Sequence, residues 1–170
     1  MLRVAGCVAD SIVDGPGLRL TVFFQGCHHH CPGCQNPATW PFEGGEEYTV
    51  EQLVAQAKES PLCRGVTLSG GEPFDQAAEA AQLAAALKAA GYEVAAYTGF
   101  TFEQLLNADE DRRALLQNLD VLVDGPFVQA EMSLELRFRG SRNQRILNVP
   151  ASLAAGQAVW VTAPRWVGES

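Results

Sequence analysis

The feature that most constrains the fold is a regular alternation of strand-like and helix-like segments. Runs dense in β-branched, aromatic and other apolar residues predict strands at residues 18–24, 65–69, 93–97 and 120–123. Apolar residues at helical spacing predict helices at residues 49–59, 74–90 and 111–118, and a further helix that begins after Thr101. This alternation is typical of a parallel sheet with crossover helices, whose chemistry collects in the turns after the strands.

Length and charge limit what the chain can be. At 170 residues it is about one domain. The net charge of -8 argues against a general binder of nucleic acid or anionic membranes, because both need a basic face. No apolar run approaches the ~20 residues of a membrane span, and residues 1–17 lack a signal-peptide pattern. We therefore expect a cytoplasmic protein with neither a nucleic-acid nor a membrane partner.

Three cysteines follow the first predicted strand at close spacing. Cys27, Cys31 and Cys34 are separated by three and then two residues, so one tight loop can aim three thiols at a common point. Three thiolates fit three irons of a [4Fe–4S] cluster, which normally takes four cysteines, and the fourth iron would be open to a ligand. Two other interpretations remain open: zinc bound by these thiolates with a histidine from residues 28–30, and a dithiol redox pair of Cys31 and Cys34.

Three further turns follow predicted strands. The segment Ser69-Gly70-Gly71-Glu72-Pro73 lets backbone groups approach a ligand closely, and the Glu72 carboxylate can accept a hydrogen bond from an ammonium group. Its competing interpretation is an ordinary turn before a helix that favours an acid and proline in its first turn. Thr98 and Gly99 end the next strand, where a helix N-cap region is equally consistent. Asp124-Gly125-Pro126 ends the fourth and is also good turn chemistry.

Together with its flanking segments, the cysteine triplet resembles the radical S-adenosylmethionine (SAM) enzymes. The triplet is the signature of these enzymes, and Ser69-Gly70-Gly71-Glu72-Pro73 strengthens the resemblance. Residues 11–17, 26–27, 34–36 and 39–40 look like the opening of glycyl-radical activating enzymes. Residues 97–100, 120–127, 138–141 and 143–145 are similar to one subfamily, the anaerobic ribonucleoside-triphosphate reductase-activating proteins. The similarity runs from about residue 11 to residue 145, and residues 147–170 contain no segment that resembles the family.

The resemblance implies a fold and an activity. The fold is an incomplete (β/α) barrel of parallel strands with outer helices, because a full eight-unit barrel needs about 250 residues. It forms one radical-SAM domain over residues 1–170, with a core at 1–146 and a C-terminal tail at 147–170. The implied activity is reductive cleavage of SAM on a [4Fe–4S] cluster to generate a glycyl radical on the large subunit of anaerobic ribonucleotide reductase. A flavodoxin-like protein is the implied external one-electron donor.

The resemblance also implies residue roles. Cys27, Cys31 and Cys34 are the implied cluster ligands and catalytic residues. The implied cofactor-binding residues are Gly33, Asn36, Ser69, Gly70, Gly71, Glu72, Thr98, Gly99 and Asp124. Among them, Ser69 to Glu72 contact the amino group of SAM, Thr98 and Gly99 its ribose or carboxylate, and Asp124 faces the adenosyl group. Asn36 lies beside the cluster, and Gly33 stands where many members carry an aromatic residue that contacts the adenine.

Three alternative functions are weighed against this one. An activating enzyme of formate-lyase type is disfavoured by residues 138–145, and such chains tend to be longer. A zinc-binding adaptor would contain no iron. A thiol–disulfide oxidoreductase would not require Cys27 or Glu72. Outside these motifs, Cys7 and Cys63 are interpreted as small buried apolar residues, and Arg137, Arg139, Arg142 and Arg145 as a solvated face or a docking surface for an acidic partner.

Overall fold

The computed structural model describes residues 2–11, 17–26, 45–126, 128, 138–139, 143–162 and 166. The cysteine triplet lies outside these residues, and so do Gly33 and Asn36. The predictions for these five residues therefore rest on sequence alone.

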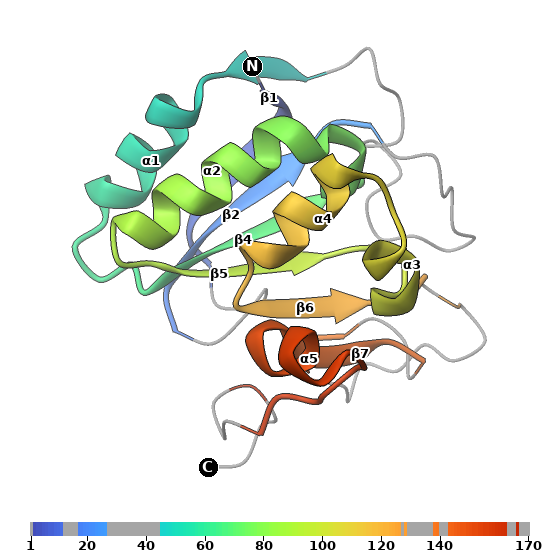
Figure 1. Ribbon diagram of the computed structural model, residues 1–170. Coiled ribbons are helices and arrows are strands. Elements are labelled where there is room, and N and C mark those ends of the chain that lie inside the picture. Colours follow the sequence, from blue (N-terminus) through green and yellow to red (C-terminus); the bar gives the residue numbers. More distant parts are fainter. Residues whose placement is uncertain are drawn as a thin grey trace.

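The described residues form a seven-stranded sheet in the order β3-β1-β2-β4-β5-β6-β7 (Figure 1). The strands are β1 Leu2–Ser11, β2 Arg19–Phe24, β3 Glu46–Tyr48, β4 Gly65–Gly70, β5 Glu93–Tyr97, β6 Val121–Asp124 and β7 Arg145–Asn148. The pairs β2–β4, β4–β5 and β5–β6 are parallel, as the alternation predicts.

The outer strands correct the prediction of an all-parallel sheet. β1 pairs antiparallel with both β2 and β3, and β7 pairs antiparallel with β6. Seven residues separate β1 from β2, whereas a parallel connection needs a dozen or more. The chain must therefore reverse direction between these two strands.

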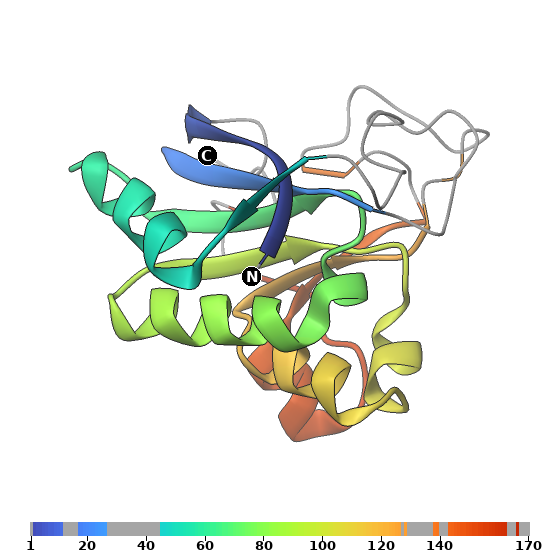
Figure 2. The ribbon, with the colours of Figure 1, turned by 90° about the horizontal axis from the view of Figure 1, so that it is seen from above.

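Helices follow the central strands much as the pattern predicts. They are α1 Val50–Glu59, the 3₁₀ helix η2 Pro73–Gln76, α2 Ala77–Ala89, α3 Phe102–Leu106, α4 Glu110–Gln117 and α5 Val149–Ala155. Capping boxes begin α1 and α3, at Thr49 with Gln52 and at Thr101 with Gln104. Figure 2 shows the helices gathered on one side of the sheet, where the main hydrophobic core lies between α1, α2, α4 and the strands.

A second, smaller apolar cluster covers the other face of the sheet. It comprises Ala95, Val121, Val123, Ile146, Val161 and Trp166. Residues 147–162 complete β7, form α5 and return along β7, with hydrogen bonds from Asn148 N to Val159 O (2.8 Å) and from Val161 N to Ile146 O (2.9 Å). Residues 159–161 thus run beside β7, where Trp160 bridges to Leu147.

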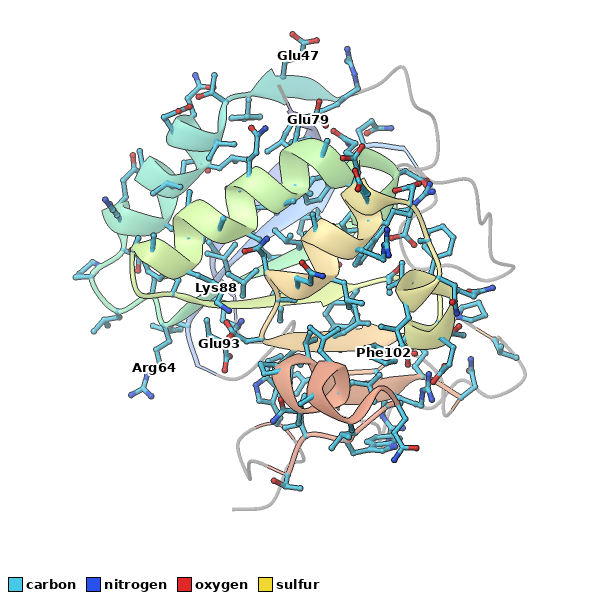
Figure 3. All side chains as sticks on the ribbon, viewed as in Figure 1. Glu47, Arg64, Glu79, Lys88, Glu93 and Phe102 are labelled. Carbon is cyan, nitrogen blue, oxygen red and sulfur yellow. The ribbon has the colours of Figure 1, made fainter. Side chains whose placement is uncertain are left out.

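A buried arginine joins this cluster to the amino ends of the parallel strands. The side chain of Arg19 is fully buried and donates to Thr67 Oγ1 (2.9 Å) and Glu93 Oε1 (2.9 Å). Its guanidinium also lies 5.4 Å from the ring centre of Trp166. Figure 3 shows Glu93 at this end of the sheet and Phe102 near the opposite end. Arg19 therefore stabilises the end of the sheet that lies away from the predicted site.

We expect Arg19→Met to lower the free energy of unfolding by about 3 kcal/mol, because Glu93 would keep its charge without its buried partner. Urea titration of the purified protein measures the change. The matched control is Arg113→Met, since Arg113 is exposed on α4, and it should change stability by less than about 0.5 kcal/mol. Equal stabilities for the two variants would contradict this role of Arg19.

Candidate functional site

The predicted site residues that the structure describes lie in the turns that follow parallel strands. Ser69 to Glu72 end β4, Thr98 and Gly99 follow β5, and Asp124 ends β6. Because the carboxyl ends of neighbouring parallel strands meet at one edge of a sheet, the structure brings these turns together. β2 reaches the same edge at Phe24, three residues before Cys27.

The Gly-Gly turn after β4 lies directly against the end of β2. Gly71 N donates to Phe24 O and Glu72 N to Gly26 O, both at 2.8 Å. A Cβ atom on Gly71 would lie 2.2 Å from Gly26 O, and one on Gly70, whose φ is +84°, would lie 2.6 Å from Phe24 N. Only glycine permits this approach. The turn is therefore fixed against Gly26, the residue that precedes Cys27.

The Glu72 carboxylate is bound by the chain itself. Its side chain is buried and accepts hydrogen bonds from Thr98 Oγ1 (2.9 Å to both oxygens), Gly99 N (2.7 Å) and Phe74 N (3.2 Å). The bond from Phe74 makes Glu72 the N-cap of η2, with Pro73 in the first turn, so the helix-start interpretation of this segment is confirmed. The bonds from Thr98 and Gly99 join the end of β4 to the end of β5. The predicted contact between Glu72 and the amino group of SAM stays a prediction.

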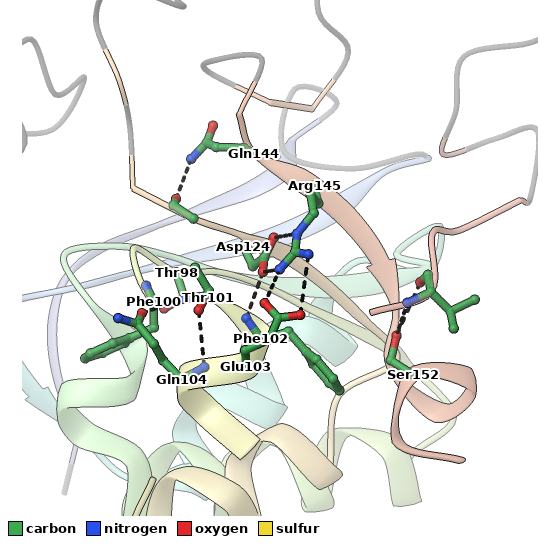
Figure 4. A network of polar contacts seen from close by, with 12 residues as sticks. Thr98, Phe100, Thr101, Phe102, Glu103, Gln104, Asp124, Gln144, Arg145 and Ser152 are labelled. Carbon is green, nitrogen blue, oxygen red and sulfur yellow. Dashed lines mark hydrogen bonds and ion pairs between the residues drawn. The ribbon is translucent and has the colours of Figure 1, made fainter. Parts of the chain in front are cut away.

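Thr98 and Gly99 belong to a turn that precedes α3 rather than to its cap. The N-cap is Thr101, whose hydroxyl accepts from Gln104 N at 3.2 Å (Figure 4). Thr98 N donates to Val123 O (3.0 Å), and the Thr98 hydroxyl accepts from Phe100 N (3.1 Å). The turn formed by residues 98–102, here called the β5–α3 turn, is thus bonded to β4 through Glu72 and to β6 through Val123.

Asp124 is fully buried at the end of β6 and forms an ion pair with Arg145. Arg145 donates to its two oxygens at 3.0 and 2.5 Å, and Phe102 N donates to Oδ2 at 2.8 Å (Figure 4). The hydrogen bond from Arg145 to Asp124 raises the pKa of Arg145 above its usual value. Glu103 also pairs with Arg145 at 2.7 Å, and the hydrogen bond from Arg145 lowers the pKa of Glu103.

Sequence reasoning missed this pairing. It singled out Arg145 as a member of a solvated or docking face, whereas the structure shows an arginine that bonds a buried carboxylate. Asp124 and Arg145 are directly opposite each other across the β6–β7 pair. The register of two strands brings them together, and no local pattern in the sequence signals that register. Of the other three arginines, Arg137 and Arg142 lie outside the described residues.

The described residues contain no group of three His, Cys, Asp or Glu side chains placed to hold a metal ion. Within the same residues, no helix has the length and apolar character needed to cross a membrane. Cys7 and Cys63 are both half-buried thiols without a disulfide, and burial raises the pKa of Cys7.

Comparison with known proteins assigns the class of the chain. The family model described as "4Fe-4S single cluster domain" matches residues 13–147. The chain is therefore an iron–sulfur protein of the single-cluster class, and the match favours a [4Fe–4S] cluster over zinc or a dithiol pair.

The similar proteins then identify the family. The chain is 40% identical over 143 residues to the anaerobic ribonucleoside-triphosphate reductase-activating protein of Vibrio cholerae serotype O1, covering 79% of this chain and 90% of that one. It is 33% identical to the protein of the same name from Haemophilus influenzae (79% and 90% covered) and 35% identical to that from Escherichia coli strain K12 (78% and 90%). The chain belongs to the anaerobic ribonucleoside-triphosphate reductase-activating protein family.

Among solved structures, QueE from Escherichia coli aligns with a TM-score of 0.48 at 19% identity, covering 59% of this chain and 53% of that one. This likeness is too weak to bear on the fold or the function. The family assignment rests on the sequence relatives, and it confirms the resemblance drawn from the sequence motifs.

We expect Gly71→Ala to destabilise the protein by about 2 kcal/mol, because backbone must move to relieve the contact with Gly26. Since Gly26 precedes Cys27, the same variant should bind less iron per chain after anaerobic reconstitution. Gly6→Ala is the matched control, because a Cβ there meets nothing within 4 Å. Denaturant titration and iron analysis give the two readouts, and a Gly71→Ala protein with wild-type stability and iron content would contradict the expectation.

Proposed function

We propose that the chain is a radical SAM activase that generates a glycyl radical on anaerobic ribonucleoside-triphosphate reductase. The observation that carries this proposal is its 33–40% identity, over about 90% of their length, to relatives named as activating proteins of that reductase. An activating enzyme of formate-lyase type is the weaker alternative, because none of these three relatives carries such a name.

The cofactor site is proposed from the cysteine triplet and the turns beside it. Cys27, Cys31 and Cys34 would hold a [4Fe–4S] cluster, which normally takes four cysteines, and SAM would bind where the fourth cysteine is lacking. The described residues fit this assignment, because the Gly-Gly-Glu turn is hydrogen-bonded to Gly26, the residue before Cys27. Gly33 directly precedes Cys34 in the sequence, Asn36 follows it by two residues, and both are proposed to contribute to the same site. The remaining SAM-binding residues are Ser69, Gly70, Gly71, Glu72, Thr98, Gly99 and Asp124.

A [4Fe–4S] cluster bound there would supply the electron for reductive cleavage of SAM, the chemistry on which glycyl-radical formation depends. The described residues fix the positions of the segments that are expected to contact SAM. Gly70 and Gly71 allow the turn after β4 to lie against β2. Glu72 holds Thr98 and Gly99 beside that turn, so the segments expected to contact SAM have a fixed mutual arrangement.

The fold that we propose for this activity is an incomplete barrel. Four neighbouring strands, β2, β4, β5 and β6, are parallel and carry helices on one face, whereas a full barrel has eight parallel strands. An incomplete barrel leaves one side open, which suits a protein loop as substrate. The proposed partners are the large glycyl-radical subunit and an external, flavodoxin-like one-electron donor in the cytoplasm. The acidic charge of the chain gives no reason to expect nucleic acid or a membrane as a partner.

Anaerobic reconstitution with iron and sulfide, followed by dithionite and SAM, tests this proposal. The wild-type protein should form 5′-deoxyadenosine, and Cys31→Ala should form none, because the cluster would lose one of three ligands. Cys7→Ala is the matched control, since Cys7 lies on β1 outside the triplet, and it should keep its activity. Zinc without iron or labile sulfide in the wild-type protein would contradict the proposal.

A further inference from the structure

Two segments singled out in the sequence bond to each other residue by residue. Arg145 pairs with Asp124, Gln144 Nε2 donates to Gly125 O (3.1 Å), and Asn143 Nδ2 donates to Pro126 O (2.8 Å). The side chains of residues 143–145 therefore fix every residue of the turn at the end of β6.

The β5–α3 turn is held from both sides by buried carboxylates. On the β4 side, Glu72 accepts from Thr98 and Gly99. On the β6 side, Asp124 accepts from Phe102 N, and Gly125 N donates to Phe100 O at 2.9 Å. Both carboxylates are buried, with 1% of Glu72 and none of Asp124 exposed. Both carboxylates therefore accept hydrogen bonds from the chain itself in this structure.

We propose that Arg145 is a positioning residue for SAM. Arg145 acts through Asp124 on the β5–α3 turn. Arg145 fixes Asp124 by two hydrogen bonds, Asp124 fixes the amide of Phe102, and the turn that ends at Phe102 contains Thr98 and Gly99. The inference rests on the proposed function, in which Thr98 and Gly99 contact SAM. For Asp124 it replaces the direct contact with SAM proposed above by an effect that passes through the β5–α3 turn, because both carboxylate oxygens already bind Arg145 and Phe102.

The chemistry of the pair favours arginine specifically. A planar guanidinium can donate to both oxygens of Asp124 and still reach Glu103, as Arg145 does here. A lysine ammonium is a point charge and cannot reproduce that fork. A neutral side chain at position 145 would leave Asp124 buried without its cation, and its hold on Phe102 would weaken.

A double-mutant cycle on the reconstituted protein tests the inference. Equilibrium dialysis gives the Kd for SAM of the wild type, Arg145→Met, Asp124→Asn and the double variant, with iron content measured for each. Each single variant should raise the Kd about tenfold while iron content is unchanged. The double variant should lie within about twofold of either single variant, because both substitutions break the same connection. Cleavage at saturating SAM should fall less than binding does.

Two further variants are measured in the same way: Arg145→Lys as the conservative substitution and Arg113→Met as the control. Arg145→Lys keeps the positive charge, so it should fold even where Arg145→Met does not, and it should raise the Kd by about threefold. Arg113→Met, on the exposed face of α4, should bind SAM like the wild type.

Each outcome decides between the inference and the proposed function. Weak binding by Asp124→Asn with wild-type binding by Arg145→Met and Arg145→Lys would overturn the inference, because Asp124 would then contact SAM directly. Loss of iron with an unchanged Kd would also overturn it. A wild-type protein that holds iron yet does not bind SAM would instead refute the proposed function, and the inference would fail with it.

Discussion

The arrangement of the site depends on one close backbone approach, between Gly71 after β4 and Gly26 after β2. The carbonyl oxygen of Gly26 lies 2.2 Å from where a Cβ at position 71 would be, so this contact exists only because position 71 is glycine. Through it the Gly-Gly-Glu turn is fixed against the chain that leads into the cysteine triplet. The motif thus has a structural reason that is independent of any ligand, and it contacts Gly26, the residue that precedes Cys27 in the sequence.

From this contact the arrangement extends along the edge of the sheet through buried carboxylates. Glu72 joins the end of β4 to the β5–α3 turn, and Asp124 joins that turn to β6 and, through Arg145, to β7. Buried carboxylates are costly unless they are paired or well hydrogen-bonded, and here each accepts several hydrogen bonds. One connected polar network therefore joins the turns after β4, β5 and β6 to Arg145 at the start of β7.

The central fold could be predicted from sequence because local patterns specify it. Capping boxes at Thr49 and Thr101 and runs such as residues 93–97 are local signals, and the structure confirms the helices and parallel strands that they predict. β1 and β7 were not predicted, because their antiparallel pairing depends on contacts distant in sequence. The partners of Glu72 and Asp124 could not be predicted for the same reason, because Thr98 and Arg145 lie 26 and 21 residues away in the sequence. The triplet Cys27, Cys31 and Cys34 was found by its spacing alone.

Electron paramagnetic resonance most directly tests the proposal that the chain generates a radical on a glycine of the large reductase subunit. The reduced, reconstituted protein is mixed anaerobically with SAM and the large subunit of the anaerobic reductase. A glycyl radical signal should appear, and its splitting should collapse when the large subunit carries glycine deuterated at the α-carbon. Formation of 5′-deoxyadenosine without any glycyl signal on that subunit would contradict the proposal, because the chain would then cleave SAM for a different substrate.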